Sequence, residues 1–500
     1  MNKFKTVISE LSIVFIFLLL YYGEVSSQTY VDVLPGFSTL NDAITNNTDP
    51  NAIFRLQRGA GAIYLLNGSI TNKKPLQIEA AAGTDARPQI IPGIGSGGVS
   101  DIAFRAKANL TLKGVYVAGK DEGGAYLSQI IRVQADKVKL YLYDCFLENT
   151  AQSAIRTDNK LSKIYLINSN VRNCVSDYAN GRGIDDRGVD MDTLYVENCT
   201  IYSIGSKFLR DGGGVLNYAF INHNTFMNNA IQVMQFGECP KVVFKNNLII
   251  DCGFMGHGVH ATNALLQLKP LTSSVYAGLT QTVDVQHNNF YINPQYSMLY
   301  ADTVIMMPNY DAQMQAMVTV AGKDNTNISE QISFTFAPPI VSSLVPQFWN
   351  DPLGESSTTA VGLRVNGNYN FAYLNSARSY SYGTANQPIG ALTWFNIAVG
   401  VKDNLQLPVG YKLFQNYPNP FNPTTNINYS LSKNADVELT IYNSLGQVVR
   451  TLVNSSQPAG SYSVMWDGSN QAGQKLASGI YLYKLTTGDF VTVKKMILMK

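Results

Sequence analysis

The stretch LYVENCTI, residues 194–201, contains the pattern that decides the fold of this 500-residue chain. Apolar and polar side chains alternate up to Glu197, as in a strand with one buried face. The polar and small pair Asn198-Cys199 follows, and an apolar side chain then returns at Ile201. This form recurs between residues 105 and 295, which indicates an internal repeat. The other copies are YLYDCFL (141–147), YLINSNV (165–171), AFINHNTF (219–226), VVFKNNLI (242–249) and VDVQHNNF (283–290).

The spacing of the repeat predicts a right-handed parallel β-helix in an all-β chain. Steps of 24, 30, 25, 23 and 41 residues separate the first members of the polar pairs. About two dozen residues suit a coil of three short strands and three turns, and such coils bury their apolar sides against one another. The first members are Asp144, Asn168, Asn198, His223, Asn246 and His287. We expect the second members to stack as a ladder at one corner: Cys145, Ser169, Cys199, Asn224, Asn247 and Asn288.

Both ends of the repeat contain segments that suit caps. GFSTLNDAI, residues 36–44, predicts an amphipathic helical turn with Ser38 or Thr39 as N-cap, covering the first coil. This opening resembles the start of exported pectate-lyase-like β-helix proteins. Residues 300–400 lose the repeat and are rich in proline, so we expect a final coil plus a loop-rich cap. The solenoid is therefore predicted over residues 28–400, with a linker at 401–412.

The N-terminus has the layout of a cleaved signal peptide. Lys3 and Lys5 precede an apolar run at residues 13–20, and small residues stand before Gln28. The apolar core is too short for a spanning helix. We expect residues 1–27 to direct export, with no transmembrane segment after their removal.

The last 88 residues predict a second, smaller domain. YPNPFNPTT (417–425) cannot continue a helix, and short alternating runs separated by glycine turns then follow to Lys500, as in a small β-sandwich. Residues 413–500 resemble the type A sorting domain of the bacterial type IX secretion system. The resemblance implies recognition by that secretion machinery and a protein that is released or held at the cell surface. The alternative is an ordinary C-terminal sandwich used for binding.

Composition excludes several classes of partner and site. A formal charge of +2, with 14% charged residues, gives no basic field for nucleic acid. Five cysteines without metal-type spacing argue against a disulfide framework and a zinc site, so we expect small buried thiols. We expect a monomer.

A second set of polar residues recurs at coil spacing, each directly after an apolar residue. If the register holds, these side chains form an outward stripe, because strand residues alternate between faces. Arginines at this spacing suit a polyanion, since a guanidinium grips carboxylates in pairs. Arg187 in the segment GIDDRG (183–188) could add a binding contact. The predicted stripe contains Arg132, Arg156, Asp185 or Asp186, Arg210, Gln232 and His260.

The stripe suggests a polysaccharide lyase that acts on a uronate polymer by β-elimination. KFLRDGG (207–213) resembles the arginine-glycine segment of chondroitinase-B-like and alginate-cleaving β-helix lyases, which implies that Arg210 neutralises the carboxylate or acts as acid. The lysine of that family has no clear counterpart. Arg156 is a second catalytic candidate, and His260 could be a base near neutral pH.

A metal ion and other functions remain open. Asp185 and Asp186, in the densest carboxylate group, could hold Ca²⁺, or they could stand in a solvated turn. A non-catalytic glycan-binding or adhesive surface protein is the main alternative to the lyase. A polygalacturonase-like hydrolase would need clustered carboxylates, which Asp185, Asp186 and Asp211 could offer, although its motifs are absent.

Overall fold

The computed structural model describes residues 29–93, 102–175, 181–254, 264–276, 278–297, 310–320, 326–344, 363–397, 411–416, 419–431, 435–457, 460–488 and 490–499. The chain divides into two compact units, residues 1–399 and 400–500. The predicted signal peptide, most of the predicted linker, and both His257 and His260 lie outside the described residues.

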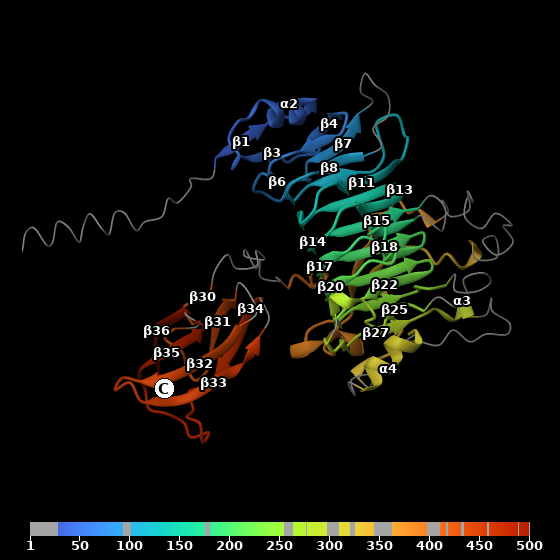
Figure 1. Ribbon diagram of the computed structural model, residues 1–500. Coiled ribbons are helices and arrows are strands. Elements are labelled where there is room, and N and C mark those ends of the chain that lie inside the picture. The colour runs from blue at the N-terminus through green and yellow to red at the C-terminus, as the bar shows by residue number, and fades with distance from the viewer. Residues whose placement is uncertain are drawn as a thin grey trace, which may run out of the picture. The chain divides into compact units, whose positions relative to one another are not determined.

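The first unit is a parallel β-solenoid, which confirms the predicted fold class (Figure 1). Its coils stack through three ladders of parallel strands. Ladder 1 contains the strands in which the repeat was recognised. It consists of β1 (Tyr30–Val33), β3 (Ile53–Leu56), β6 (Leu76–Ala80), β9 (Leu110–Lys113), β12 (Lys139–Tyr143), β14 (Ser162–Ile167), β17 (Met191–Glu197), β20 (Leu216–Asn222), β23 (Lys241–Lys245) and β26 (Thr282–Gln286).

Ladders 2 and 3 share one long strand, β13 (Phe146–Thr157), which runs through both. Ladder 2 otherwise contains β2 (Gly36–Phe37), β4 (Ile63–Asn67), β7 (Gln89–Gly93), β10 (Tyr116–Ala118), β15 (Asn170–Cys174), β18 (Thr200–Ile204), β21 (Thr225–Asn229), β24 (Leu248–Ile250) and β27 (Asn289–Tyr291). Ladder 3 otherwise contains β5 (Ile70–Asn72), β8 (Ile102–Ala106), β11 (Leu127–Val133), β16 (Arg182–Asp185), β19 (Lys207–Arg210), β22 (Gln232–Glu238) and β25 (Leu266–Lys269).

The corner between ladders 1 and 2 explains the polar pair of the repeat. All six first members adopt a left-handed backbone, with φ between 51° and 58°. Asn and Asp tolerate this conformation far better than β-branched residues do. The second members form the predicted ladder, which begins at Cys145. From Ser169 to Asn288, each side chain accepts a hydrogen bond from the backbone N–H of its equivalent in the preceding coil. Asn327 continues the ladder by one further coil, beyond the repeat seen in the sequence.

The cysteines are buried and none forms a disulfide, as predicted. Cys145 and Cys199 occupy the corner ladder, where their thiols donate to backbone carbonyl oxygens. Burial raises the pKa of Cys145 to about 12. These thiols are therefore packing groups rather than nucleophiles.

Short helices cover the two ends of the stack. Helix α2 (Thr39–Asn46) places Leu40 in the core at the first coil. Ser38 is the N-cap residue, as predicted, although its hydroxyl donates to Asp42 at 3.0 Å instead of accepting an amide hydrogen. Helix α4 (Ala312–Val320) buries Met314 and Val318 at the other end (Figure 1).

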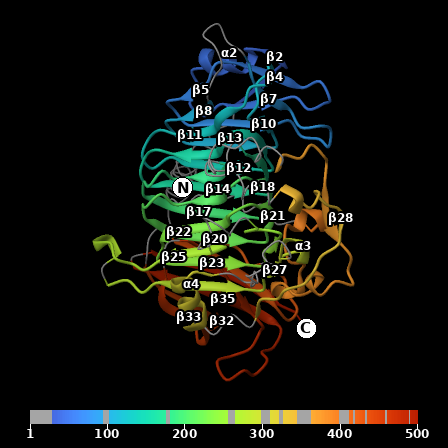
Figure 2. The ribbon, with the colours of Figure 1, turned by 90° about the vertical axis from the view of Figure 1, so that its right-hand side faces the viewer.

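Residues 363–397 differ from the predicted cap, and we call them the strap. They lie along the outside of ladder 2 instead of closing the end of the stack (Figure 2). Strand β29 (Asn370–Tyr373) of the strap pairs with β28 (Phe334–Phe336), and η6 (Arg378–Tyr380), η7 (Thr384–Asn386) and η8 (Leu392–Phe395) are short 3-10 turns. The remaining short helices of this unit are α3 (Pro294–Ser297), η2 (Ser274–Tyr276) and η4 (Ser342–Leu344).

The second unit is the small C-terminal β-sandwich that the sequence predicts. One antiparallel sheet contains β30 (Lys412–Leu413), β31 (Thr425–Leu431) and β34 (Gly460–Trp466). The other contains β33 (Val448–Gln457), β32 (Ala435–Asn443), β35 (Gly479–Thr487) and β36 (Phe490–Leu498). Trp466, Tyr429 and Tyr483 fill the space between them. Among the described residues, no helix has the length and apolar character needed to cross a bilayer.

Candidate functional site

The outward face of ladder 3 carries a row of polar side chains, one from each coil. Paired residues align in the order Thr71, Arg105, Arg132, Arg156, Asp185, Arg210, Gln235 and Gln267. The neighbouring apolar residues, such as Ile131 and Leu209, point into the core. We call this set the ladder 3 row. The predicted stripe is therefore present from Arg132 to Arg210.

The stripe departs from the prediction beyond Arg210. Gln235, not Gln232, aligns with Arg210, because the register pairs Gln232 with Lys207. Gln232 is fully buried and donates to the carbonyl oxygen of Ala264 at 2.7 Å, so its predicted role in substrate binding is wrong. The chain contains an apolar-glutamine pair at both positions, and spacing alone did not distinguish them. Gln267 occupies the next coil of the row, where the sequence suggested His260.

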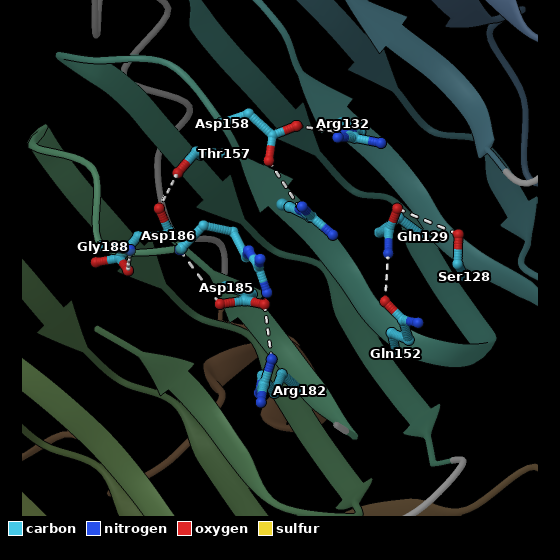
Figure 3. A network of polar contacts seen from close by, with 12 residues as sticks. Ser128, Gln129, Arg132, Gln152, Thr157, Asp158, Arg182, Asp185, Asp186 and Gly188 are labelled. Carbon is cyan, nitrogen blue, oxygen red and sulfur yellow. Dashed lines mark hydrogen bonds and ion pairs between the residues drawn. The ribbon is translucent and has the colours of Figure 1, made fainter. Parts of the chain in front are cut away.

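Two aspartates each bridge a pair of arginines along the row. Figure 3 shows the contact of Asp158 with Arg132 and that of Asp185 with Arg182. Asp158 accepts from Arg132 and from Nε of Arg156, the latter at 2.8 Å. Asp185 accepts from Nη1 of Arg182 at 2.7 Å and from Nη1 of Arg210 at 3.0 Å. These carboxylates hold the guanidinium planes in place, and they neutralise part of the positive charge.

Arg210 in the row and Lys207 beside it are two cations that are less committed to carboxylates than Arg156 is. The side chain of Arg210 is 30% exposed and makes one contact with Asp185, whereas that of Arg156 is 18% exposed. Nζ of Lys207 donates to Oε1 of Gln235 at 3.2 Å. Burial and the nearby charges of Arg210 and Arg182 lower the pKa of Lys207 to about 8. Lys207 can therefore lose its proton at mildly alkaline pH.

The sequence prediction missed several members of this site. Arg105 follows an apolar residue just as Arg132 does, and this signal could have found it. Lys207 and Arg182 pair with each other across β16 and β19, and each stands three places before a member of the row. The apolar-polar pairs read from the sequence did not include this position. Arg187 is an exposed turn residue with φ of 57°, outside the strand that carries Asp185.

The predicted Ca²⁺ ligands face other partners. Asp185 lies between two guanidinium groups, and Oδ1 of Asp186 accepts from the amides of Gly188 and Gly212 at 2.8 and 2.7 Å. Asp190 and Asp192 pair with Lys160 and Lys163. The described residues contain no group of three or more His, Cys, Asp or Glu side chains arranged to hold a metal. These aspartates, as they stand, do not fit a Ca²⁺ site.

The remaining carboxylates and histidines have structural surroundings. Asp186 and Asp211 are 3% and 5% exposed, so neither can reach a substrate as the hydrolase alternative requires. His223 and His287 occupy the left-handed corner. Burial lowers the pKa of His223, which favours the neutral ring.

Comparison with known proteins finds a family match within the C-terminal unit. The FlgD Ig-like domain family matches residues 419–489. No curated protein matches the chain. Dimeric latent PorU from Porphyromonas gingivalis is similar at 21% identity over 18% of this chain and 9% of that chain, with a TM-score of 0.16. PorZ, an essential surface component of the type-IX secretion system of the same bacterium, is similar at 17% identity over 18% of this chain and 11% of that chain, with a TM-score of 0.14. The chain spans about a tenth of the length of these structures.

Proposed function

We propose that this is an exported protein whose solenoid binds an acidic polysaccharide along the ladder 3 row. The observation that carries the proposal is the alignment of Arg105, Arg132 and Arg156 on three successive coils, with Arg210 in the same row two coils further on. A linear polymer with one carboxylate or sulfate per sugar presents charges at a similarly regular repeat. Guanidinium groups bind such anions through paired hydrogen bonds.

The internal aspartates suit this role, because they orient the arginines and neutralise only part of their charge. Asp158 and Asp185 each serve two arginines, so cations outnumber carboxylates in the row. Lys207 adds a further cation below its pKa of about 8. A bound polyanion would gain from this surplus, and its affinity should fall as salt rises.

Cleavage by β-elimination is the second candidate function, and Lys207 is the observation that favours it. Arg210 and Arg182 would neutralise the uronate carboxylate, which acidifies the neighbouring carbon-bound proton. The neutral amine of Lys207 would accept that proton. A carbon–carbon double bond then forms as the glycosidic C–O bond breaks, and the departing oxygen takes up a proton. Arg156, held by Asp158, would bind the adjoining sugar.

Ultraviolet absorbance of unsaturated uronate ends tests cleavage directly. The full chain would be incubated with pectate, alginate and chondroitin at pH 8.5, with Ca²⁺ and with chelator. The lyase proposal expects a rise on one substrate that Lys207→Met and Arg210→Ala each reduce by at least roughly 100-fold. Lys163→Met, which removes an ion-paired lysine of ladder 1, is the matched control.

A flat trace on all three polymers would leave polysaccharide binding, and salt-sensitive retention of the same polymers would support it. Absence of both cleavage and retention would exclude the proposal for these substrates. A rise that Lys207→Met leaves unchanged would point to another base, for which His260 is the sequence candidate. The chelator series also tests the Ca²⁺ prediction.

For the C-terminal unit we propose an export role. Support comes from the type A sorting-domain resemblance of residues 413–500 and from the compact Ig-like sandwich. In a host with a type IX system, deleting these residues should retain the protein inside the outer membrane. Secretion of the truncated chain at the wild-type level would contradict this role.

A further inference from the structure

Two buried carboxyl groups lie directly beside the ladder 3 row. Asp185 pairs with Arg210 across adjacent coils, so the next residues, Asp186 and Asp211, are also neighbours. The amide of Asp186 donates to the carbonyl oxygen of Arg210 at 3.2 Å. Oδ1 of Asp211 accepts from the amide of Gly213 at 2.6 Å. The pair is thus held by the turns that follow β16 and β19, beside the row.

The packing around Asp211 leaves its carboxyl group no room to move away. A side-chain Cβ on Gly237 would stand 1.5 Å from Oδ2 of Asp211, so only glycine fits in the next coil. Gly237 also has a φ of 62°, which glycine adopts without strain. The close approach of this backbone excludes water from the carboxyl pair.

Two adjacent carboxylates in such a place cannot both be ionised at low cost. Burial and then the charge of Asp211 raise the pKa of Asp186 to about 7. Burial raises the pKa of Asp211 as well. The charged or titratable groups that act on the pair are Asp185 on β16, Lys269 on β25, Cys239 after β22 and Tyr276 on η2.

We infer that Asp186 and Asp211 share one proton, and that its release lowers the positive charge of the ladder 3 row and weakens its hold on an acidic polymer. This inference rests on the proposed polysaccharide binding. The new negative charge appears one residue away from both Asp185 and Arg210. Because the pair is buried, salt screens this charge less than it screens a surface charge. The row should therefore bind more tightly at pH 5.5 than at pH 7.5.

The test compares wild type with Asp211→Asn and with the matched control Asp251→Asn. Asp251 is also 3% exposed, and burial raises its pKa to about 6, but it follows β24 in ladder 2. The full chain would be titrated with alginate oligosaccharides and with dextran sulfate between pH 5.5 and 7.5 at constant ionic strength. This range keeps Lys207 largely charged.

We expect the affinity of wild type and of Asp251→Asn to fall roughly three- to ten-fold over this range, and that of Asp211→Asn less than about two-fold. An equal fall in Asp211→Asn and wild type would overturn the inference. The inference would also be overturned if Asp211→Asn and Asp251→Asn flattened the pH dependence of the affinity equally, because the effect would then not be local to the row. Asp186→Asn provides a second variant if Asp211→Asn does not fold.

Thermal unfolding between pH 5 and 8 separates this inference from the proposed function. Sharing of the proton predicts that Asp211→Asn loses less stability with rising pH than wild type does. Equal slopes would show that the pair does not titrate. If stability depends less on pH in Asp211→Asn than in wild type, but no polymer binds at any pH, the shared proton is supported and the proposed function is refuted.

Discussion

Ladders 2 and 3 belong to the same coils, yet their outward faces differ. The outward row of ladder 2 includes Tyr202, Met227 and Ile250, which the strap covers. The row of ladder 3 consists of polar side chains, among which those of Arg132, Arg156 and Arg210 remain partly exposed. Arg172 makes the contrast clear: its side chain is 8% exposed and donates to Gly367 of the strap, whereas that of Arg210 is 30% exposed.

The difference teaches that the solenoid backbone does not decide which face is functional. Parallel ladders present the same backbone on every side, and one outward residue per coil determines whether a face needs a cover. Apolar outward residues gain about 25 cal/mol for each Å² that a covering segment buries. Charged outward residues would lose hydration under such a cover. Ladder 3 therefore stays open where ladder 2 is covered, as the proposed polymer binding requires.

The largest loss of stability is expected when an aromatic ring is removed from the strap, since this tests whether the strap covers ladder 2. Phe371 is 1% exposed, and its ring centroid lies 5.1 Å from that of Tyr202 and 5.6 Å from that of Trp394. We expect Phe371→Ala to lower the free energy of unfolding by about 3–5 kcal/mol, since it leaves a cavity. Urea unfolding measures this. Phe336→Ala, at a ring that is 54% exposed, should cost much less, and equal costs would show that the strap does not bury ladder 2 as described.

A somewhat smaller loss is expected when the strap loses its guanidinium anchor. Arg364 donates to the carbonyl oxygens of Asn173, Thr150 and Val175, and its guanidinium carbon lies 3.9 Å from the ring centroid of Tyr126. Arg364→Met keeps the apolar stem but leaves buried carbonyl groups unpaired, which should cost about 2–4 kcal/mol. Limited proteolysis should then cut residues 363–397 faster. Arg378→Met, which removes only a contact with Tyr382, is the control, and equal cleavage rates would refute the anchor.

The pH dependence of stability gives an intermediate effect that sharpens the comparison. The pKa values of Asp186, about 7, and Asp251, about 6, are raised chiefly by burial above the usual value near 4. The folded state therefore holds protons that the unfolded state has released. The stability that these bound protons contribute is fully present below about pH 4, and it is lost as pH rises through 7. We expect the urea midpoint of the solenoid to fall from pH 5 to pH 8. The corresponding loss in the free energy of unfolding should be roughly 1–3 kcal/mol.

The pH dependence of stability should have one source near ladder 3 and another near ladder 2. Asp186→Asn would remove the part near ladder 3, and Asp251→Asn the part near ladder 2, so each variant alone should flatten the profile partially. A midpoint that stays constant or rises with pH in wild type would contradict the assignment.

The smallest effect on stability is expected in the ladder 3 row itself. Arg210→Ala leaves Asp185 paired with Arg182 and removes a partly exposed side chain, so unfolding should change by less than about 1 kcal/mol. Retention on an alginate column should nevertheless fall at least roughly five-fold. Denaturation and retention of the same preparation measure both quantities. A large loss of stability with unchanged retention would make Arg210 a structural residue like Arg172.

The coil was predictable because its constraints act locally. The left-handed corner selects Asn, Asp or His at six positions, and the next residue must offer an acceptor to the adjacent backbone. Both requirements repeat with the coil and are visible in one chain. Alternation of apolar residues also placed Arg132, Arg156 and Arg210 in one row, and it left open whether Asp185 or Asp186 joins them.

The site could be predicted only in part, since its electrostatics depend on contacts between coils. Nothing in the spacing distinguished Gln235 from Gln232, because both follow an apolar residue in the same strand. The low pKa of Lys207 arises from its burial near Arg182 and Arg210, which come together only through the register of β16 and β19.

The sequence by itself determined the parallel solenoid, its polar corner and the C-terminal sandwich, because periodic burial and turn geometry leave their marks residue by residue. The tertiary structure alone decided which outward face is covered. The strap returns to ladder 2 from more than 100 residues away, with Leu392 donating to Asn198 and Val365 to Asn173. Such contacts have no period in the chain, so the open face of the molecule follows from packing rather than from pattern.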